Sequence, residues 1–183
     1  MRPLPGAERK ILFSGPPGAG KTSAISMLSD IPVVGTDARA TDTTAELKER
    51  TTVAMDYGLI RLPTGDRVHL YGTPGQERFG FMRGILGKGA IGLVILLRST
   101  SEEPLDDLAR FAEAHAEFMA DNETVIGVTG LDLQRDPGIA AFREHARSLG
   151  IDAPVAEVDA RDERDVRQIV TILLTLMDPC VRR

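Results

Sequence analysis

Short apolar runs alternate along the chain with segments in which apolar residues recur three and four positions apart. The runs KILFS at 10–14, IGLVILL at 91–97 and TVIGV at 124–128 have the length and composition of strands buried on both faces of a sheet. The segments between them have the spacing of helices that bury one face. This alternation predicts an α/β domain whose mostly parallel sheet has helices on both faces.

The pattern predicts six strands and four helices. The expected strands are 10–14, 53–60, 67–71, 91–97, 124–128 and 155–158, and the expected helices are 21–28, 105–120, 139–149 and 166–177. The turn residues PTGD at 63–66 join two of these strands as a hairpin, so we expect one antiparallel pair in the sheet. His115 lies on the apolar stripe of the helix at 105–120 without a second metal-type residue, which favours a structural histidine.

Length and charge narrow the classes of function. A chain of 183 residues fits one domain, residues 1–183, with its core at about 10–177. The net charge of −5, with both signs interspersed, argues against a nucleic-acid partner. The chain has no apolar run of the ~20 residues that a membrane span needs. It has no signal-peptide pattern and only one cysteine, Cys180, so we expect the cytoplasm and no transmembrane segment.

Cys180 stands fourth from the end, as in a prenylation box, but Arg182 occupies a position where that box has an aliphatic residue. We therefore expect an unmodified carboxyl terminus.

The segment GPPGAGKT follows a strand and begins a helix, which is the context of a phosphate-binding loop. Its glycines let backbone N–H groups converge on phosphate oxygens, its lysine reaches the terminal phosphates, and its threonine hydroxyl can ligate Mg²⁺. The loop is also common in AAA+ ATPases and similar to that of small-molecule kinases, so it does not choose the nucleotide. The predicted contacts are Gly15, Pro17, Gly18, Ala19, Gly20, Lys21, Thr22 and Ser23.

The segment YGTPGQERF at 71–79 resembles the second switch of Ras-superfamily GTPases, whose pattern is Asp-x-x-Gly-Gln. The resemblance implies that the N–H of Gly75 meets the γ-phosphate and that Gln76 orients the attacking water. Gly72 stands where the family has its aspartate, which holds Mg²⁺ through water. We therefore expect the metal coordination to be weaker or re-routed.

The long polar segment at 35–51 has no sustained apolar period, which favours a functional loop. The resemblance implies a threonine at its end that closes over Mg²⁺ and the γ-phosphate. Thr52 fits this role by its place before a strand, with Thr51 as the alternative register and a β-branched strand start as the structural alternative. Arg50 is a candidate catalytic arginine, and a solvated surface charge is the alternative.

The segment TGLD at 129–132 follows a strand where the superfamily has the guanine-reading motif Asn-Lys-x-Asp. Asp132 is retained, with helix capping as the alternative role, while the asparagine and lysine are absent. A carboxylate facing two donors favours guanine over adenine, but the missing lysine stem leaves the base less tightly held. The predicted base-side contacts are Thr129, Leu131, Asp132, Ala160 and Arg161.

From 10 to about 177 the chain is similar to the prokaryotic MglA-like small GTPases, and most of all to the conservon-type group. This resemblance implies GTP and GDP as ligands, Mg²⁺ as cofactor with Thr22 and Thr52 as its ligands, and hydrolysis that depends on Gln76 and Lys21. It also implies a roadblock-type protein as activator or effector, with peripheral membrane association through partners left open. Pro17 replaces a glycine common in small GTPases, and we expect it to slow hydrolysis.

Two other functions remain open from the residues alone. Gly72 and the incomplete base motif are compatible with a nucleotide-binding interaction module that has lost catalysis. The GPPGAGKT loop is compatible with an ATP-dependent phosphotransferase. Hydrolysis with Mg²⁺ discriminates the first alternative from a GTPase switch, and preference for GTP or ATP discriminates the second.

Overall fold

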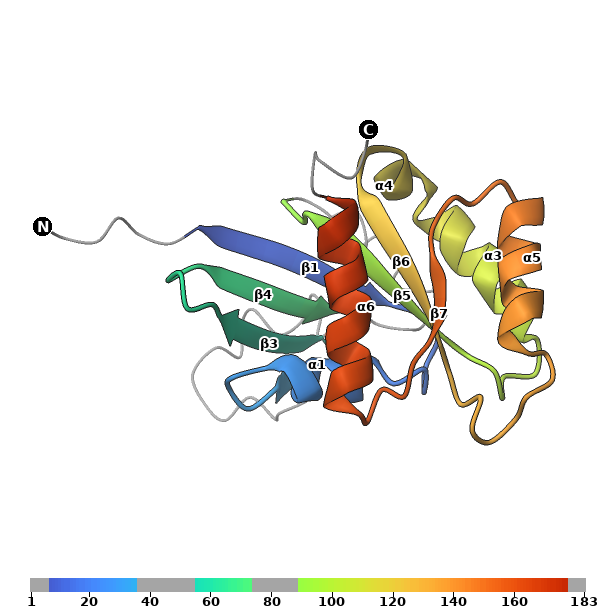
Figure 1. Ribbon diagram of the computed structural model, residues 1–183, viewed down its shortest axis with the longest axis horizontal. Helices are drawn as coiled ribbons and strands as arrows, with labels where there is room; N and C mark the ends of the chain where they lie inside the picture. The colour runs from blue at the N-terminus through green and yellow to red at the C-terminus, as the bar shows by residue number, and fades with distance from the viewer. Residues whose placement is uncertain (1–6, 36–54, 74–88, 178–183) are drawn as a thin grey trace, which may run out of the picture.

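The computed structural model describes residues 7–35, 55–73 and 89–177. Within these ranges the chain forms a seven-stranded sheet in the order β2-β3-β4-β1-β5-β6-β7, with helices on both faces (Figure 1). The strands are β1 (Glu8–Ser14), β2 (Val34–Gly35), β3 (Asp56–Arg61), β4 (Arg67–Gly72), β5 (Gly92–Arg98), β6 (Glu123–Thr129) and β7 (Val155–Glu157). The helices are α1 (Lys21–Leu28), α3 (Pro104–Ala114), α4 (Ala116–Asp121), α5 (Ile139–Ser148) and α6 (Glu163–Leu176).

The pairing of the strands confirms an α/β fold with a mostly parallel sheet. Strand β1 lies parallel to β4 and β5, and β6 lies parallel to β5 and β7. Strand β3 runs antiparallel to both of its neighbours, β4 and β2. The prediction of six strands was therefore one short, because β2 is only two residues long and carries no detectable alternation.

The two faces of the sheet carry separate apolar cores, and both are covered by helices as predicted. Helices α1 and α6 pack together on one face, where Ile25 of α1 and Leu173 of α6 are fully buried. Helices α3 and α5 pack on the other face, where Phe142 is fully buried. In Figure 1, α6 crosses in front of the sheet while α3 and α5 lie to its right. Helices therefore cover both faces of the sheet. The loops that follow the parallel strands lie at the edge where those strands end, which we call the carboxyl edge.

The helix predicted at 105–120 is two helices, α3 and α4, with a break at His115. This side chain is 4% exposed, and its Nε2 lies 2.7 Å from the Oγ of Ser14 at the end of β1. Thr73, directly after β4, donates its hydroxyl to the same Oγ at 3.0 Å. His115 is therefore a structural residue, as expected. The break was missed because the apolar spacing continues across it.

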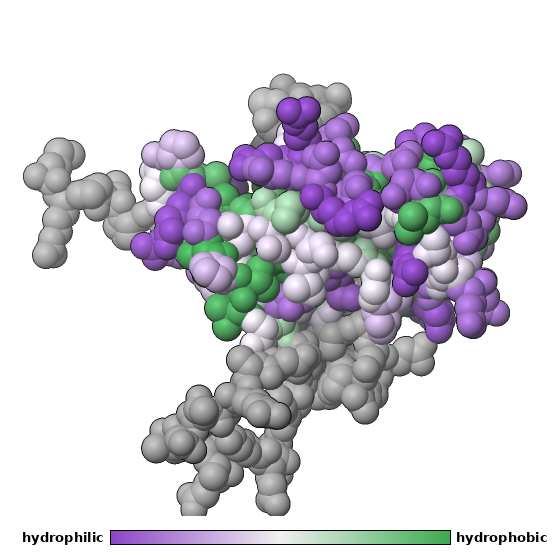
Figure 2. All heavy atoms as spheres, turned by 90° about the horizontal axis from the view of Figure 1, so that it is seen from below, coloured by the Kyte–Doolittle hydropathy of each residue, from purple (hydrophilic) through white to green (hydrophobic). Residues whose placement is uncertain are grey.

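The surface of the described residues is mostly polar. Figure 2 shows hydrophilic side chains over much of the face seen from below, with hydrophobic ones gathered in a few places. Large hydrophobic residues are exposed singly along the chain, at Met27, Val34, Leu62, Leu133, Leu149 and Leu174. In the same ranges no helix combines the length and the hydrophobicity that crossing a bilayer requires.

Replacing His115 by leucine should lower the free energy of unfolding by about 1–3 kcal/mol, because a buried polar contact with Ser14 is lost. Urea unfolding followed by circular dichroism measures the loss. His115→Gln, which keeps a polar side chain in the same place, should lose less. Equal midpoints for wild type and His115→Leu would contradict a stabilising role for this contact.

Candidate functional site

The loop between β1 and α1 lies directly on the ends of neighbouring strands. Gly15 has φ +139°, and a Cβ added there would stand 1.9 Å from the carbonyl oxygen of Leu96 in β5. Gly20 has φ +94°, and its added Cβ would stand 2.6 Å from the Cβ of Ala160 after β7. Only glycine fits these two positions, because both have positive φ and an added Cβ would collide with the backbone of β5 at Gly15 and with the side chain of Ala160 at Gly20. The loop can therefore bring its N–H groups close to a ligand.

Lys21, the first residue of α1, is 9% exposed and turns back over the loop. Its Nζ donates to the carbonyl oxygens of Gly15 and Pro16, at 2.8 Å each. An ammonium has three N–H donors, so one is left for a ligand. Burial lowers the pKa of Lys21 to about 8, and the carboxylate of Asp56 opposes this shift. The charge is therefore retained at neutral pH but lies close to its titration point.

The next residue, Thr22, contacts the carboxylate of Asp56, which was not among the site residues predicted from the sequence motifs. Its Oγ1 donates to the Oδ2 of Asp56, at the start of β3, at 2.5 Å. Asp56 pairs across the hairpin with Gly72, the position where the second switch motif has its aspartate. A Cβ added to Gly72 would stand 3.1 Å from the Cβ of Asp56 and 3.2 Å from its Oδ2. Asp56 thus occupies the space that a side chain at position 72 would enter.

The other half of the site is a cavity of about 240 Å³ between the phosphate loop and the loops after β6 and β7. Residues 18–20 of the phosphate loop and Asp132 line it. Thr129, which stands in place of the motif's asparagine, has its hydroxyl 3.2 Å from the carbonyl of Ala19 and 3.1 Å from that of Leu97. A threonine hydroxyl donates once, so one carbonyl is bonded at a time. Either bond ties the end of β6 to its neighbours.

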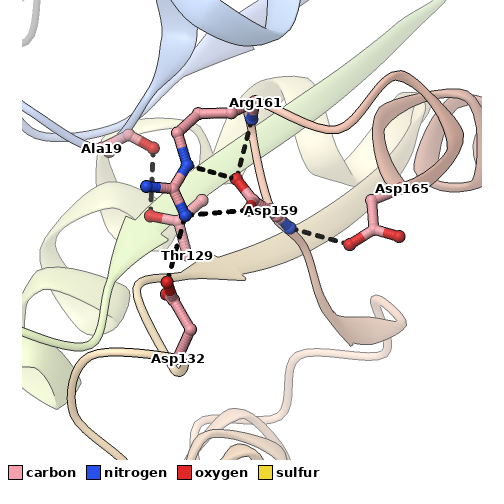
Figure 3. Close-up of polar contacts among 6 residues, drawn as sticks. All are labelled: Ala19, Thr129, Asp132, Asp159, Arg161 and Asp165. Carbon is pink, nitrogen blue, oxygen red and sulfur yellow. Dashed lines mark hydrogen bonds and ion pairs between the residues drawn. The ribbon is translucent and has the colours of Figure 1, made fainter.

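Arg161 joins the two acidic residues of this cavity (Figure 3). Its Nη2 donates to the Oδ2 of Asp132 at 3.0 Å, while its Nε donates to the Oδ1 of Asp159 at 2.9 Å. The hydrogen bonds from Arg161 hold the pKa of Asp159 below its usual value, and the two aspartates raise the pKa of Arg161. These side chains are exposed, so their ion pairs contribute little to stability. In this arrangement one oxygen of Asp132 is bonded to Arg161.

The structure brings most of the predicted nucleotide contacts together around the loop and this cavity. Pro17 and Gly18 are exposed at the loop's tip, and Ser23 lines the cavity from α1. Leu131 is 6% exposed, packs in the core on the α3 and α5 side, and is not among the residues that line the cavity. Four predicted residues lie outside the described ranges: Arg50, Thr52, Gly75 and Gln76.

Among the described residues of the site, sequence reasoning missed Asp56 and four that line the cavity, namely Arg98, Gly130, Leu133 and Asp159. Asp56 could have been found from the hairpin. Counting residue pairs back along the two strands from the turn at 63–66 places Asp56 opposite Gly72. Leu133, which is 72% exposed and lines the cavity beside Asp132, gave no pattern signal. Arg98 ends an otherwise apolar strand at the carboxyl edge, where ligands bind in open α/β sheets, and that was an available signal.

Two similarities to known proteins bear on this chain. The chain is 37% identical over 90 residues to an uncharacterized protein of Methanocaldococcus jannaschii, in a match that covers 49% of this chain and 51% of that protein. It is 28% identical over 160 residues to the Ras-related protein RABD2a of Arabidopsis thaliana, covering 87% of this chain and 74% of that one. No protein-family model matches the chain. The chain thus spans only about half of the first relative's length.

The similarity to the Ras-related protein extends over most of the chain and agrees with the fold. A mostly parallel sheet flanked by helices, with a glycine loop between β1 and α1, is the arrangement of P-loop proteins. Together the two observations support a small GTPase of the Ras superfamily.

The titration of Lys21 should appear in phosphate binding. The ammonium of Lys21 has a pKa of about 8 when no ligand is bound. Affinity for a non-hydrolysable GTP analogue should therefore be constant below neutral pH and decline as the pH rises above about 8. The limiting slope is roughly tenfold per pH unit. Calorimetric titration from about pH 6.5 to 8.8 measures it.

Lys21→Arg is the control for this titration, because a guanidinium stays charged throughout the range. The variant should bind more weakly but with no dependence on pH. A wild-type affinity that stays constant to the upper end of the range would contradict the lowered pKa.

Proposed function

We propose that this protein binds and hydrolyses GTP as a molecular switch of the small GTPase type, cycling between GTP and GDP states to control a partner protein. The observation that carries the proposal is the carboxylate of Asp132, which lines the cavity beside the phosphate loop. A carboxylate accepts from both the ring N1–H and the exocyclic amine of guanine, whereas adenine presents an acceptor at N1. The loop selects a nucleotide, and this residue selects the base.

The surroundings of Asp132 suit a planar base. Arg161 donates to its Oδ2, and a carboxylate retains further lone pairs for the two guanine donors. Leu133, exposed beside it, offers apolar area to cover a ring. Ala160, next to the loop at Gly20, can present its backbone N–H to the guanine oxygen, as the resemblance implies.

Residues at the phosphate end fit a magnesium ion. Thr22 donates its proton to Asp56 and keeps lone pairs on its oxygen, and oxygen ligands are those that Mg²⁺ prefers. When bound, Mg²⁺ neutralises charge that develops on the β- and γ-phosphate oxygens. Lys21 holds the same oxygens with its remaining donor, and Asp56 keeps the threonine hydroxyl oriented.

The residues of the hydrolytic step are assigned by motif. In this proposal Gln76 orients the water, Gly75 meets the γ-phosphate and Thr52 closes over it as a further metal ligand. Arg50 is the proposed catalytic arginine, and Pro17 keeps turnover slow without a partner. Membership of the MglA-like group, a cytoplasmic location and a roadblock-type partner complete the proposal, and they rest on the resemblance alone.

Gly72 and the incomplete base motif are the two reasons for the alternative of a module that has lost catalysis. Asp56 weakens the first reason, because its carboxylate contacts Thr22 from the strand that pairs with Gly72. An enzyme that keeps a carboxylate beside its loop threonine has retained a means of holding Mg²⁺.

Titration with Mg·GTP and Mg·ATP tests the proposal directly. We expect tighter binding of GTP by at least roughly tenfold, since adenine leaves an acceptor facing the carboxylate of Asp132. Asp132→Asn should reduce that preference while phosphate binding persists. Stronger binding of ATP would support the phosphotransferase, and GTP binding without Mg-dependent phosphate release, even with a partner, would support the inactive module.

Exchange of Asp56 and Gly72 tests the re-routed carboxylate. Asp56→Gly should raise the Mg²⁺ concentration for half-maximal hydrolysis by roughly tenfold or more, because Thr22 loses its acceptor. The double variant Asp56→Gly with Gly72→Asp should recover part of that loss, since removing the Asp56 side chain takes away two of the three nearest atoms at position 72 and leaves the Cδ1 of Ile25, the end of a flexible side chain, at 3.1 Å. Unchanged magnesium dependence in Asp56→Gly would exclude the role proposed for this residue.

A further inference from the structure

Arg98, the last residue of β5, lines the cavity between the phosphate loop and Asp132. Its Nη1 lies 3.3 Å from the position that a Cβ on Gly18 would occupy, so its guanidinium reaches the phosphate loop. Its Nε donates to the hydroxyl of Thr100, which fixes the near end of the guanidinium. Arg98 is therefore directed into the site rather than along the outer surface.

Arg98 differs in its ion pairs from Arg161, the other arginine that lines the cavity. Arg161 is engaged by two carboxylates, those of Asp132 and Asp159. Within the described ranges Arg98 forms no ion pair. Without Arg98, these two aspartates and one arginine would present net negative charge to an anionic ligand. Arg98 balances that charge next to the loop.

Arg98 also fills the place of a residue that the base motif lacks. Gly130 stands where the motif has its lysine, with φ +80°, a conformation that strains any other side chain. A Cβ added there would stand 3.2 Å from the Oγ of Ser99 and 3.9 Å from the Cγ of Arg98. Arg98 pairs in register with Thr129, so it enters this space from the adjacent strand.

We propose that Arg98 replaces the missing lysine and holds the ribose and α-phosphate end of the nucleotide against the phosphate loop. The proposal rests on the proposed function, since it assumes a nucleotide in the cavity. The aliphatic part of the Arg98 side chain lies beside Gly130, which is close in sequence to Asp132, and its guanidinium lies beside Gly18 of the phosphate loop. The anionic group of a nucleotide nearest to the base is the α-phosphate, and guanidinium binds phosphate oxygens through paired N–H donors.

The Arg98→Ala variant tests this inference by nucleotide affinity and release. Loss of a charged hydrogen bond should raise Kd for both GDP and GTP by a similar factor, roughly 10- to 100-fold, mainly through faster release. The single-turnover hydrolysis rate at saturating Mg·GTP should fall by a smaller factor than the affinity, because the α-phosphate does not react. Stopped-flow release of a fluorescent GDP, equilibrium titration and a quenched single turnover measure the three quantities.

Three further variants separate charge from packing. Arg98→Lys keeps the charge but not the paired N–H donors, so it should lose less affinity than Arg98→Ala but not match the wild type, whereas Arg98→Met, which keeps an apolar stem without the charge, should behave like Arg98→Ala. Arg147→Ala removes one positive charge from an exposed site on α5 and should leave affinity unchanged. Wild-type affinity in Arg98→Ala, or in Arg98→Met, would overturn the inference.

The failure of this inference and that of the proposed function are distinguishable. Ribose and α-phosphate are common to GTP and ATP, so a wild-type preference for ATP would reject the GTPase while Arg98→Ala still lost affinity for ATP. A wild type that prefers GTP, with Arg98→Ala unaffected, would reject only the role of Arg98. Thermal unfolding of each variant verifies that the fold is kept.

Discussion

The site depends on the close contact of the phosphate loop with the end of β5. Gly15 passes so near to the carbonyl of Leu96 that no side chain fits between them. Lys21 then bonds two carbonyls of the loop from its buried position, and Thr129 reaches the carbonyl of Ala19 from β6. Each contact uses backbone carbonyls, so the loop's shape is set by the sheet beneath it. A ligand therefore meets N–H groups that are already arranged.

The same sheet explains how two motif positions can be glycine. Gly72 and Gly130 are both adjacent in space to a charged residue on a neighbouring strand, Asp56 in the first case and Arg98 in the second. At the carboxyl edge, side chains of neighbouring strands converge on one space, so a charge can come from either strand. At Gly72 an added Cβ would crowd Asp56, whereas at Gly130 it would only touch Arg98, at 3.9 Å from its Cγ. In the proposed function, each missing motif residue is compensated from the neighbouring strand.

Much of the fold followed from the pattern of apolar residues. The long strands, the helices on both faces and the hairpin turn all had clear periodicity or turn residues, whereas β2 is two residues long and the break at His115 interrupts no apolar spacing. The phosphate loop was found because its residues are contiguous. Asp56 and Arg98 were missed because their roles arise from strand register, and a motif read along the chain contains none of that information.

The two ends of the site differ in how firmly they are built. Lys21 is buried and bonded to the backbone, so it cannot leave without exposing two carbonyls and unpacking the loop. Asp132 and Arg161 are exposed and screened by solvent, so their pair can rearrange at small cost. In the proposed function, nucleotide selection therefore combines a rigid phosphate end, which supplies most of the affinity, with an exposed base end, where Asp132 discriminates between bases.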